Sequence, residues 1–236
     1  MIKGLLFDLD GVLLDTEMWH IRLDEKCLKD LGYDDVDPMV FVHLIGAGKG
    51  MDPWEAIYRQ LPEEYRKKGF KEEFRSYKMS QFDFPPFKEL IFPEVRNTLK
   101  RLKEEGYLMA CCSSSRPEYI HKALKDCEIS EYFDVVLSGH DFVASKPDPE
   151  IYLTAMRRLG LNADECMVIE DSPYGIKAGK NAGMAVSCIK DHHFNMDQSE
   201  ADYMFDDLEG LYTLLQGTQE KDPSQIMGQC LVPYFE

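Results

Sequence analysis

The chain has 236 residues, a length that suits one large domain or a core with a smaller second domain. Its hydrophobic content of 44% is enough for a packed interior and argues against intrinsic disorder. Because 43 acidic residues outnumber 27 basic ones, the net charge is −16, which disfavours nucleic acid and anionic membranes as partners.

The seven cysteines are scattered without C-x-x-C spacing, so we expect neither a disulfide framework nor a zinc site. Reduced and mostly buried thiols are typical of a cytoplasmic protein. Asp8 and Asp10 interrupt the first apolar run, which is therefore not typical of a signal peptide. No uninterrupted apolar stretch approaches the length of a transmembrane helix. We expect a cytoplasmic monomer with no membrane partner.

The first predicted element is a short apolar strand over residues 2–7, which ends at Asp8. A helix is predicted over residues 16–31, with Asp15 or Thr16 available to cap its start and a glycine just past its end. One face of this helix is expected to carry the apolar residues that recur every four positions: Trp19, Leu23, Cys27 and Leu31.

Two further helices are predicted before any second strand. One opens with Asp52 as its N-cap and Pro53 at its first position, and the other covers roughly residues 62–80. No pattern between residues 15 and 87 is typical of a strand. This block is therefore predicted to be a helical insertion between the first strand and the rest of the chain.

After Pro86 the pattern changes to a strict alternation of helices with short apolar runs. The predicted helices span residues 92–106, 117–129, 148–160 and 174–183, and the predicted strands span residues 107–115, 133–139, 165–172 and 184–189. Such alternation indicates a parallel sheet covered by helices on both faces. Residues 218–236 have weak periodicity and are left unassigned.

Polar side chains follow several of the predicted strands. Asp8 and Asp10 end the first strand, Ser113 to Ser115 end the second, Glu170 and Asp171 end a later one, and Lys146 precedes a helix. Ligands of open parallel sheets bind beyond the carboxyl ends of the strands, so we expect these groups to converge there. Two carboxylates about 4 Å apart repel by roughly 4 kcal/mol at an effective dielectric near 20. A hard cation such as Mg²⁺ would offset that repulsion.

Four segments in order resemble the motifs of the haloacid dehalogenase superfamily: "DLDGV", the serine after the second strand, "SKPDPEIY" and "VIEDS". The resemblance is greatest to the β-phosphoglucomutase-like branch of sugar phosphatases and mutases. It implies an α/β fold with a Rossmann-like parallel sheet core, residues 1–14 and 88–236. It also implies an inserted α-helical cap domain, residues 15–87, that closes over the substrate.

Carried over to this sequence, the resemblance implies a role for each motif residue. Asp8 is the nucleophile that forms an aspartyl-phosphate, and Asp10 is the general acid and base. Ser113 and Lys146 bind the transferring phosphoryl group. The implied Mg²⁺ ligands are Asp8, the backbone carbonyl of Asp10 and Asp171, with Glu170 as a further ligand or as a support behind the ligands.

The substrate-binding residues implied by the resemblance lie in two places. Gly46 and Lys49 belong to the cap loop "LIGAGKG", and His20 lies on the first cap helix. Ser114 and Arg116 follow the second strand. Lys49 is equally compatible with an exposed lysine, and His20 with helix packing.

The implied function is a Mg²⁺-dependent phosphatase acting on a small phosphorylated metabolite, with a sugar phosphate as the expected substrate. The alternative is a phosphomutase, but Ile45 replaces a lysine and Lys49 an arginine of that branch, which weakens it. A receiver-like phosphoacceptor signalling module also clusters aspartates, a hydroxyl and a lysine. Its paired acids precede the acceptor aspartate on another strand, however, and it has no helical insertion. A catalytically dead scaffold is disfavoured because every motif residue is present.

Overall fold

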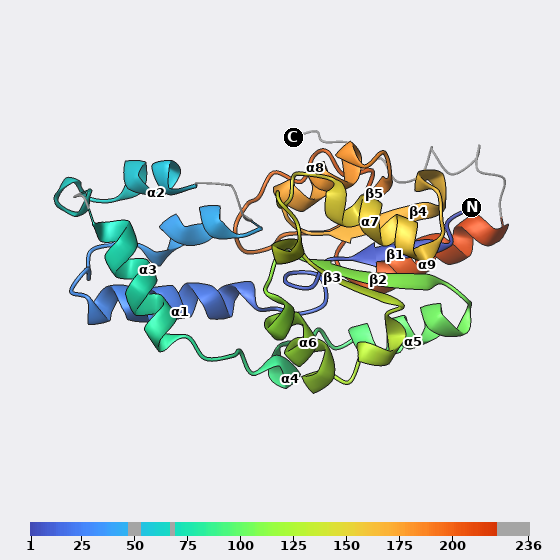
Figure 1. Ribbon diagram of the computed structural model, residues 1–236, viewed down its shortest axis with the longest axis horizontal. Coiled ribbons are helices and arrows are strands. Elements are labelled where there is room, and N and C mark those ends of the chain that lie inside the picture. The colour runs from blue at the N-terminus through green and yellow to red at the C-terminus, as the bar shows by residue number, and fades with distance from the viewer. Residues whose placement is uncertain (47–52, 67–68, 221–236) are drawn as a thin grey trace.

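A six-stranded parallel sheet forms the centre of the protein in a computed structural model that describes residues 1–46, 53–66 and 69–220 (Figure 1). The strands follow the spatial order β3-β2-β1-β4-β5-β6. Their bounds are β1 Gly4–Phe7, β2 Leu108–Ser113, β3 Val135–Ser138, β4 Cys166–Glu170, β5 Ala185–Ile189 and β6 Tyr203–Phe205. Each neighbouring pair is parallel, so all carboxyl ends lie along one edge of the sheet.

Alternate residues of the central strands enter two different hydrophobic cores, because successive side chains of a strand point to opposite faces. Leu5 and Phe7 of β1 pack with α5 Val95–Glu104, α6 Pro117–Asp126 and α9 Leu208–Glu220. Leu6 packs on the other face with α7 Glu150–Leu159 and α8 Pro173–Asn181. Both faces are therefore covered, which explains why these strands are apolar throughout.

The helical insertion, residues 17–81, lies between β1 and the remaining strands in the sequence and at one side of the sheet in space (Figure 1). It contains α1 Glu17–Asp30, the 3₁₀ segments η1 Pro38–Leu44 and η2 Glu63–Tyr65, α2 Trp54–Gln60 and α3 Phe70–Gln81. A core of its own, which includes Phe41, Trp54 and Phe74, holds these elements together. The chain returns to the sheet through α4 Phe87–Leu90, and short 3₁₀ segments η3 Ser130–Tyr132, η4 Gly139–Asp141 and η5 Ala163–Glu165 connect later elements.

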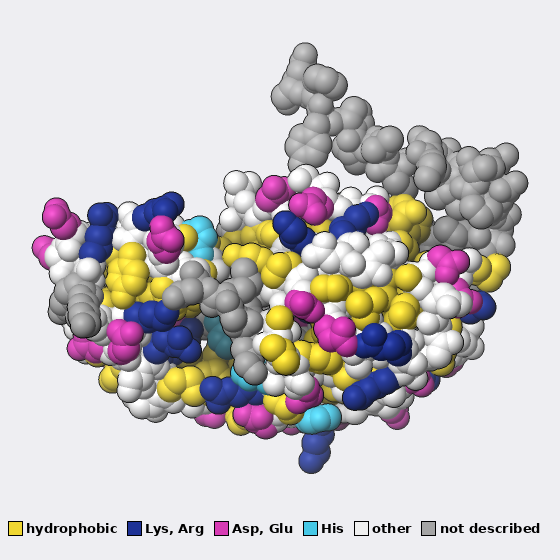
Figure 2. All heavy atoms as spheres, turned by 45° about the horizontal axis from the view of Figure 1, so that its top comes forward, with side chains coloured by type: hydrophobic (Ala, Val, Ile, Leu, Met, Phe, Trp, Pro, Cys, Tyr) yellow, Lys and Arg dark blue, Asp and Glu magenta, His cyan; other side chains and the backbone are white. Residues whose placement is uncertain are grey.

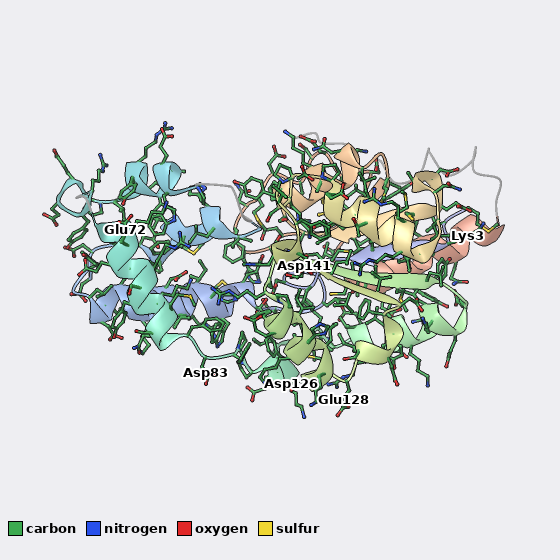
Figure 3. The ribbon with its side chains drawn as sticks, viewed as in Figure 1. Lys3, Glu72, Asp83, Asp126, Glu128 and Asp141 are labelled. Carbon is green, nitrogen blue, oxygen red and sulfur yellow. The ribbon has the colours of Figure 1, made fainter. Side chains whose placement is uncertain are left out.

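Charged side chains of both signs are intermixed over the face drawn in Figure 2. Lys3, Glu72 and Asp83, labelled in Figure 3, are exposed. Among the described residues, no helix has both the length and the apolar character needed to span a bilayer.

The predicted α/β class, the parallel sheet and the inserted helices are confirmed. The elements that were not predicted include β6 and α9, which add an edge strand and a helix after β5, and also the short helix α4 and the 3₁₀ segment η1. The single helix predicted over residues 62–80 is η2 followed by α3. The exact limits of the two proposed domains, 1–14 with 88–236 and 15–87, stay a prediction.

Candidate active site

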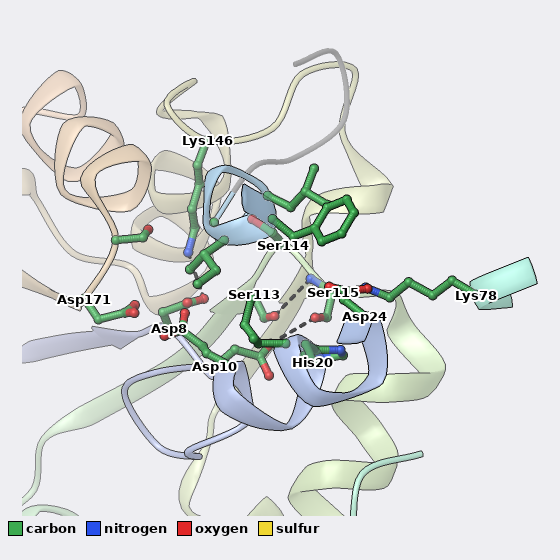
Figure 4. A pocket seen from close by; sticks show the side chains of 17 residues that line it. Asp8, Asp10, His20, Asp24, Lys78, Ser113, Ser114, Ser115, Lys146 and Asp171 are labelled. Carbon is green, nitrogen blue, oxygen red and sulfur yellow. Dashed lines mark hydrogen bonds and ion pairs between the residues drawn. The ribbon is translucent and has the colours of Figure 1, made fainter. Parts of the chain in front are cut away.

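A cavity of about 260 Å³ lies between the carboxyl edge of the sheet and the helical insertion (Figure 4). Asp8 follows β1, Ser113 ends β2 and Asp171 follows β4, so three neighbouring strands each deliver a polar side chain to this edge. Lys146 approaches from the loop before α7. The predicted convergence of these residues is therefore what the structure shows.

Lys146 makes the central ion pairs of the site. Its Nζ donates to Asp8 Oδ1 at 2.8 Å, to Glu170 Oε1 at 2.6 Å and to the carbonyl oxygen of Cys112 at 2.9 Å. The side chain is only 2% exposed, a burial that lysine tolerates only when it is paired. Burial opposes its charged form, but the two carboxylates outweigh burial and raise the pKa of Lys146, which keeps the ammonium charged.

Glu170 is fully engaged within the protein. Its Oε1 accepts from Lys146 and from the Tyr152 hydroxyl at 2.5 Å, and its Oε2 accepts from the Ser172 hydroxyl at 3.2 Å. A Cβ on Gly175 would lie 1.8 Å from Glu170 Oε1, so only glycine fits there. These contacts favour Glu170 as a residue that orients Lys146 rather than as a direct metal ligand.

Three carboxylates lie close together at this edge of the sheet. One oxygen from each of Asp8, Glu170 and Asp171 lies within 4.8 Å of the others. Asp171 Oδ1 is buried and accepts no hydrogen bond from the described residues. A buried carboxylate oxygen without a partner is costly unless a cation or water satisfies it. These residues therefore fit a hard, oxygen-binding ion such as Mg²⁺.

Burial and mutual repulsion raise the pKa values of the acidic groups in this cluster. Burial raises the pKa of Asp8 to about 7, although Lys146 opposes this, and the Glu170 and Asp10 charges add to it. Burial and the adjacent Glu17 and Glu170 carboxylates raise the pKa of Asp171 well above its ordinary value. Carboxylates crowded in this way are relieved by a bound cation.

Asp10 is held by three hydroxyl groups from separate parts of the chain. Its Oδ1 accepts from Thr16 Oγ1 at 2.5 Å and from the Tyr119 hydroxyl at 3.0 Å. Its Oδ2 accepts from Ser115 Oγ at 2.9 Å. The carboxylate therefore has a defined position in the lining of the cavity.

The three serines after β2 have different surroundings. Ser113 Oγ accepts from the backbone N–H of Ser115 at 3.0 Å, which leaves its hydroxyl hydrogen available to a ligand. Ser114 Oγ is buried and has no hydrogen-bond partner among the described residues. Both serines line the cavity.

The predicted substrate-binding residues divide between two cavities. His20 and Gly46 line the first cavity, and a Cβ on Gly46 would lie 2.7 Å from Ser172 of the core. Arg116 is instead exposed at the start of α6 and lines a neighbouring cavity of about 390 Å³ that shares His20 and Ser115 with the first. Lys49 lies outside the described residues.

Sequence patterns missed several residues that line or support the cavity. Glu17 lies beside Asp171, and burial raises the pKa of Glu17 to about 8. Glu17 directly follows Thr16 and lies in the first turn of α1, close in sequence to Asp8 and Asp10, and this position could have indicated its place at the cavity. Asp24 and Lys78 form an ion pair across α1 and α3 at the cavity wall. Nothing in their local sequence distinguishes them from surface charges.

The profile of haloacid dehalogenase-like hydrolases matches residues 5–189. The chain belongs to the haloacid dehalogenase-like hydrolase family. Phosphoglycolate phosphatase from Aquifex aeolicus is 32% identical over 183 residues, which cover 77% of this chain and 82% of the relative. Phosphorylated carbohydrates phosphatase from Thermotoga maritima is 28% identical over 185 residues, 78% of this chain and 82% of the relative.

A solved structure of β-phosphoglucomutase from Clostridium difficile is similar to this family member with a TM-score of 0.70 and 26% sequence identity. The similarity covers 93% of this chain and 98% of the β-phosphoglucomutase chain. These matches confirm the predicted superfamily and the predicted enzyme class, a hydrolase. Phosphatases are among the relatives of the chain, and a phosphomutase is among its structural neighbours.

Proposed function

We propose that the chain is a Mg²⁺-dependent phosphatase that hydrolyses a small phosphorylated metabolite, with sugar phosphates as the substrate class, through an aspartyl-phosphate on Asp8. The observation that carries this proposal is the placement of Asp8. Its Oδ1 is bound by Lys146, and its Oδ2 accepts no hydrogen bond from the described residues, so that oxygen is available to attack. The relatives named as phosphatases support the same reaction class.

In the first step, an Asp8 oxygen attacks phosphorus as the bond to the departing alcohol oxygen breaks. Asp10 gives its proton to that oxygen, and Lys146 and the Ser113 hydroxyl bind the phosphoryl oxygens. In the second step Asp10 takes a proton from a water molecule that attacks phosphorus. The bond to Asp8 then breaks and inorganic phosphate leaves.

The proposed Mg²⁺ ligands are Asp8, Asp171 and the backbone carbonyl of Asp10, with Glu170 behind them. Bound there, the ion supplies positive charge that offsets the phosphoryl oxygens and the clustered carboxylates. Asp171 Oδ1, buried without a partner among the described residues, is the atom that most favours this assignment.

The similarity to a β-phosphoglucomutase structure favours a second candidate, a phosphomutase that returns the phosphoryl group to another hydroxyl of the same sugar. The two functions differ in whether water or sugar attacks the phosphoenzyme. Incubation with glucose 1-phosphate, glucose 6-phosphate and glycerol 3-phosphate in the presence of Mg²⁺ distinguishes them. Free phosphate supports the phosphatase, and isomer formation without free phosphate would support the mutase.

Asp8→Asn tests the nucleophile directly. The two side chains are nearly isosteric, but an amide is a poor nucleophile, so we expect kcat to fall by at least about a thousandfold with the fold retained. Asp126→Asn, at a partly exposed ion pair with Lys122 on α6, is the matched control and should keep full activity. Undiminished turnover by Asp8→Asn would contradict the assignment.

A further inference from the structure

The wall of the cavity farthest from Asp8 carries a buried ion pair. Lys78 of α3 contacts Asp24 Oδ1 of α1, and the two side chains are 22% and 3% exposed. Figure 4 shows Asp8 and Asp171 at one side of the cavity and Asp24 with Lys78 at the other. A ligand with its phosphate on Asp8 would therefore direct its remaining part toward this pair.

The positive charges at this cavity are compensated by carboxylates, which is unusual for an enzyme that binds phosphate. Among the described residues that line the cavity, the cations are Lys146 and Lys78, and each is paired with a carboxylate. Lys78 thus offers hydrogen-bond donors, and Asp24 offers acceptors, without a net positive charge. A second anionic group of a ligand would meet a Lys78 ammonium whose charge Asp24 already compensates, so the attraction would not offset the loss of the anion's hydration.

The remaining surface of the cavity limits the size of the ligand. Ile21, Phe41 and Ile45 supply apolar contacts from the helical insertion. The volume of about 260 Å³ is below the range of roughly 300–1,000 Å³ found for pockets that hold drug-sized ligands. A small polyol, with carbon–hydrogen faces and several hydroxyl groups, matches this combination of apolar surface and paired donors and acceptors.

We propose that Asp24, through its ion pair with Lys78, selects phosphate monoesters of small uncharged polyols and rejects esters that carry a second phosphate or a carboxylate. This inference rests on the proposed phosphatase function and names the substrate class of the same site. It also opposes the mutase alternative, because moving a phosphoryl group between two hydroxyls of one sugar requires a bisphosphate to bind at both ends of the cavity.

The wild-type test uses ester pairs that differ mainly in charge at the far end. Glycerol 3-phosphate is compared with 3-phosphoglycerate, and glucose 6-phosphate with glucose 1,6-bisphosphate, each with Mg²⁺ and phosphate release as the readout. We expect kcat/KM to be about tenfold or more higher for the uncharged member of each pair. Equal values, or a preference for the doubly anionic ester, would overturn the selectivity and leave the phosphatase proposal standing.

The variant Asp24→Asn tests the residue itself. Removing the carboxylate leaves the Lys78 charge uncompensated, so kcat/KM for 3-phosphoglycerate should rise by about tenfold relative to glycerol 3-phosphate. Asp30→Asn is the matched control, because Asp30 lies on the same helix and pairs with Lys26 outside the cavity. The ratio should not change in Asp30→Asn. An unchanged ratio in folded Asp24→Asn would contradict the proposal.

Lys78→Gln provides an independent result if Asp24→Asn does not fold. This variant leaves the Asp24 carboxylate without its cation, so discrimination against 3-phosphoglycerate should increase by about tenfold. A decrease would show that Lys78, and not Asp24, sets the charge of this wall. Failure of the wild type to release phosphate from any ester would overturn the proposed function, and the selectivity proposal with it.

Discussion

At the scale of single residues, Asp10 shows how the site is assembled from distant positions. Ser115 and Tyr119 donate hydrogen bonds to it across more than one hundred positions of the chain. Tyr119 also packs edge-on against Phe87, at a centroid distance of 5.0 Å. Its ring therefore helps to join α4 with α6, while its hydroxyl positions the proposed acid and base.

Tyr119→Phe should separate these two roles. The ring packing is kept, but Asp10 loses one of its three donors and becomes less fixed, so kcat should fall by about tenfold. KM should change little, because Tyr119 does not line the cavity that contains Asp8. Steady-state kinetics measure both values. Tyr132→Phe is the control and should match the wild type. Tyr132 lies in η3, just before the amino end of β3, whereas the candidate site lies beyond the carboxyl ends of the strands.

His20 gives a prediction for the pH dependence of stability. Burial lowers the pKa of His20 to about 4 from 6.5. The Asp10 charge raises this pKa, and the Lys78 charge lowers it. As pH falls from 6.5 toward about 4, His20 therefore binds a proton in the unfolded chain but not in the folded protein. Its titration lowers the free energy of unfolding over this range. His20→Gln should reduce the loss of unfolding free energy over that range, measured by urea denaturation. A larger loss in the variant would mean that His20 is charged in the folded state.

At the scale of elements, the turn after β1 carries a strict geometric requirement. Gly11 has φ +76°, and a Cβ there would lie 2.1 Å from Asp171 Oδ2. The glycine therefore allows the β1 turn and the acidic group after β4 to approach each other. This contact joins two of the sequence motifs in a way that their spacing does not reveal.

Gly11→Ala should abolish most activity because Asp171 must move. Gly106→Ala is a matched control, since Gly106 also has a positive φ of 88° but nothing lies within 4 Å of an added Cβ. Both variants should lose about 1–2 kcal/mol of unfolding free energy from backbone strain. Only Gly11→Ala should also lose activity, by about a hundredfold. Equal activity in the two variants would show that the contact with Asp171 is unimportant.

The helix α1 shows where element-level prediction failed. The expected apolar face is confirmed in part: Cys27 is buried, and Leu23 and Leu31 are partly buried against the same core, but the fully buried residues also include Ile21, Asp24 and Leu28. A repeat of four drifts around a helix that has 3.6 residues per turn. The apolar pattern does not include Asp24, which is charged; the ion pair with Lys78 of α3 makes its burial tolerable.

At the scale of the whole molecule, the parallel sheet brings three acidic residues from different strands to one edge. The resulting cluster of Asp8, Glu170 and Asp171 carries more negative charge than Lys146 can offset. Folding therefore brings together carboxylates that repel one another. A cation bound among them would couple metal binding to stability.

Chelation of divalent ions should abolish phosphate release and lower Tm, and added Mg²⁺ should restore both. At a Mg²⁺ concentration one hundred times its Kd, the expected stabilisation is about 2.7 kcal/mol. Asp171→Asn should lose this response in thermal unfolding and in calorimetry. The exposed Asp141 provides the control Asp141→Asn, which should respond as the wild type does. Full activity in the presence of a chelator would rule out the proposed cofactor.

The sequence by itself determined the α/β class, the parallel sheet and the grouping of Asp8, Lys146 and Asp171. These follow from local patterns, because apolar runs form strands and the ends of parallel strands meet at one edge. The strand β6 was not predicted, because its apolar run, Tyr203–Phe205, is only three residues long and lies at the edge of the sheet.

Only the tertiary structure decided the partners of each charged group: the three hydroxyls on Asp10, Tyr152 on Glu170 and Lys78 on Asp24. Each of these contacts joins elements whose separation in the chain carries no information about their distance in space. Side-chain burial and pairing are therefore decided only when the helices, the sheet and the insertion have packed together.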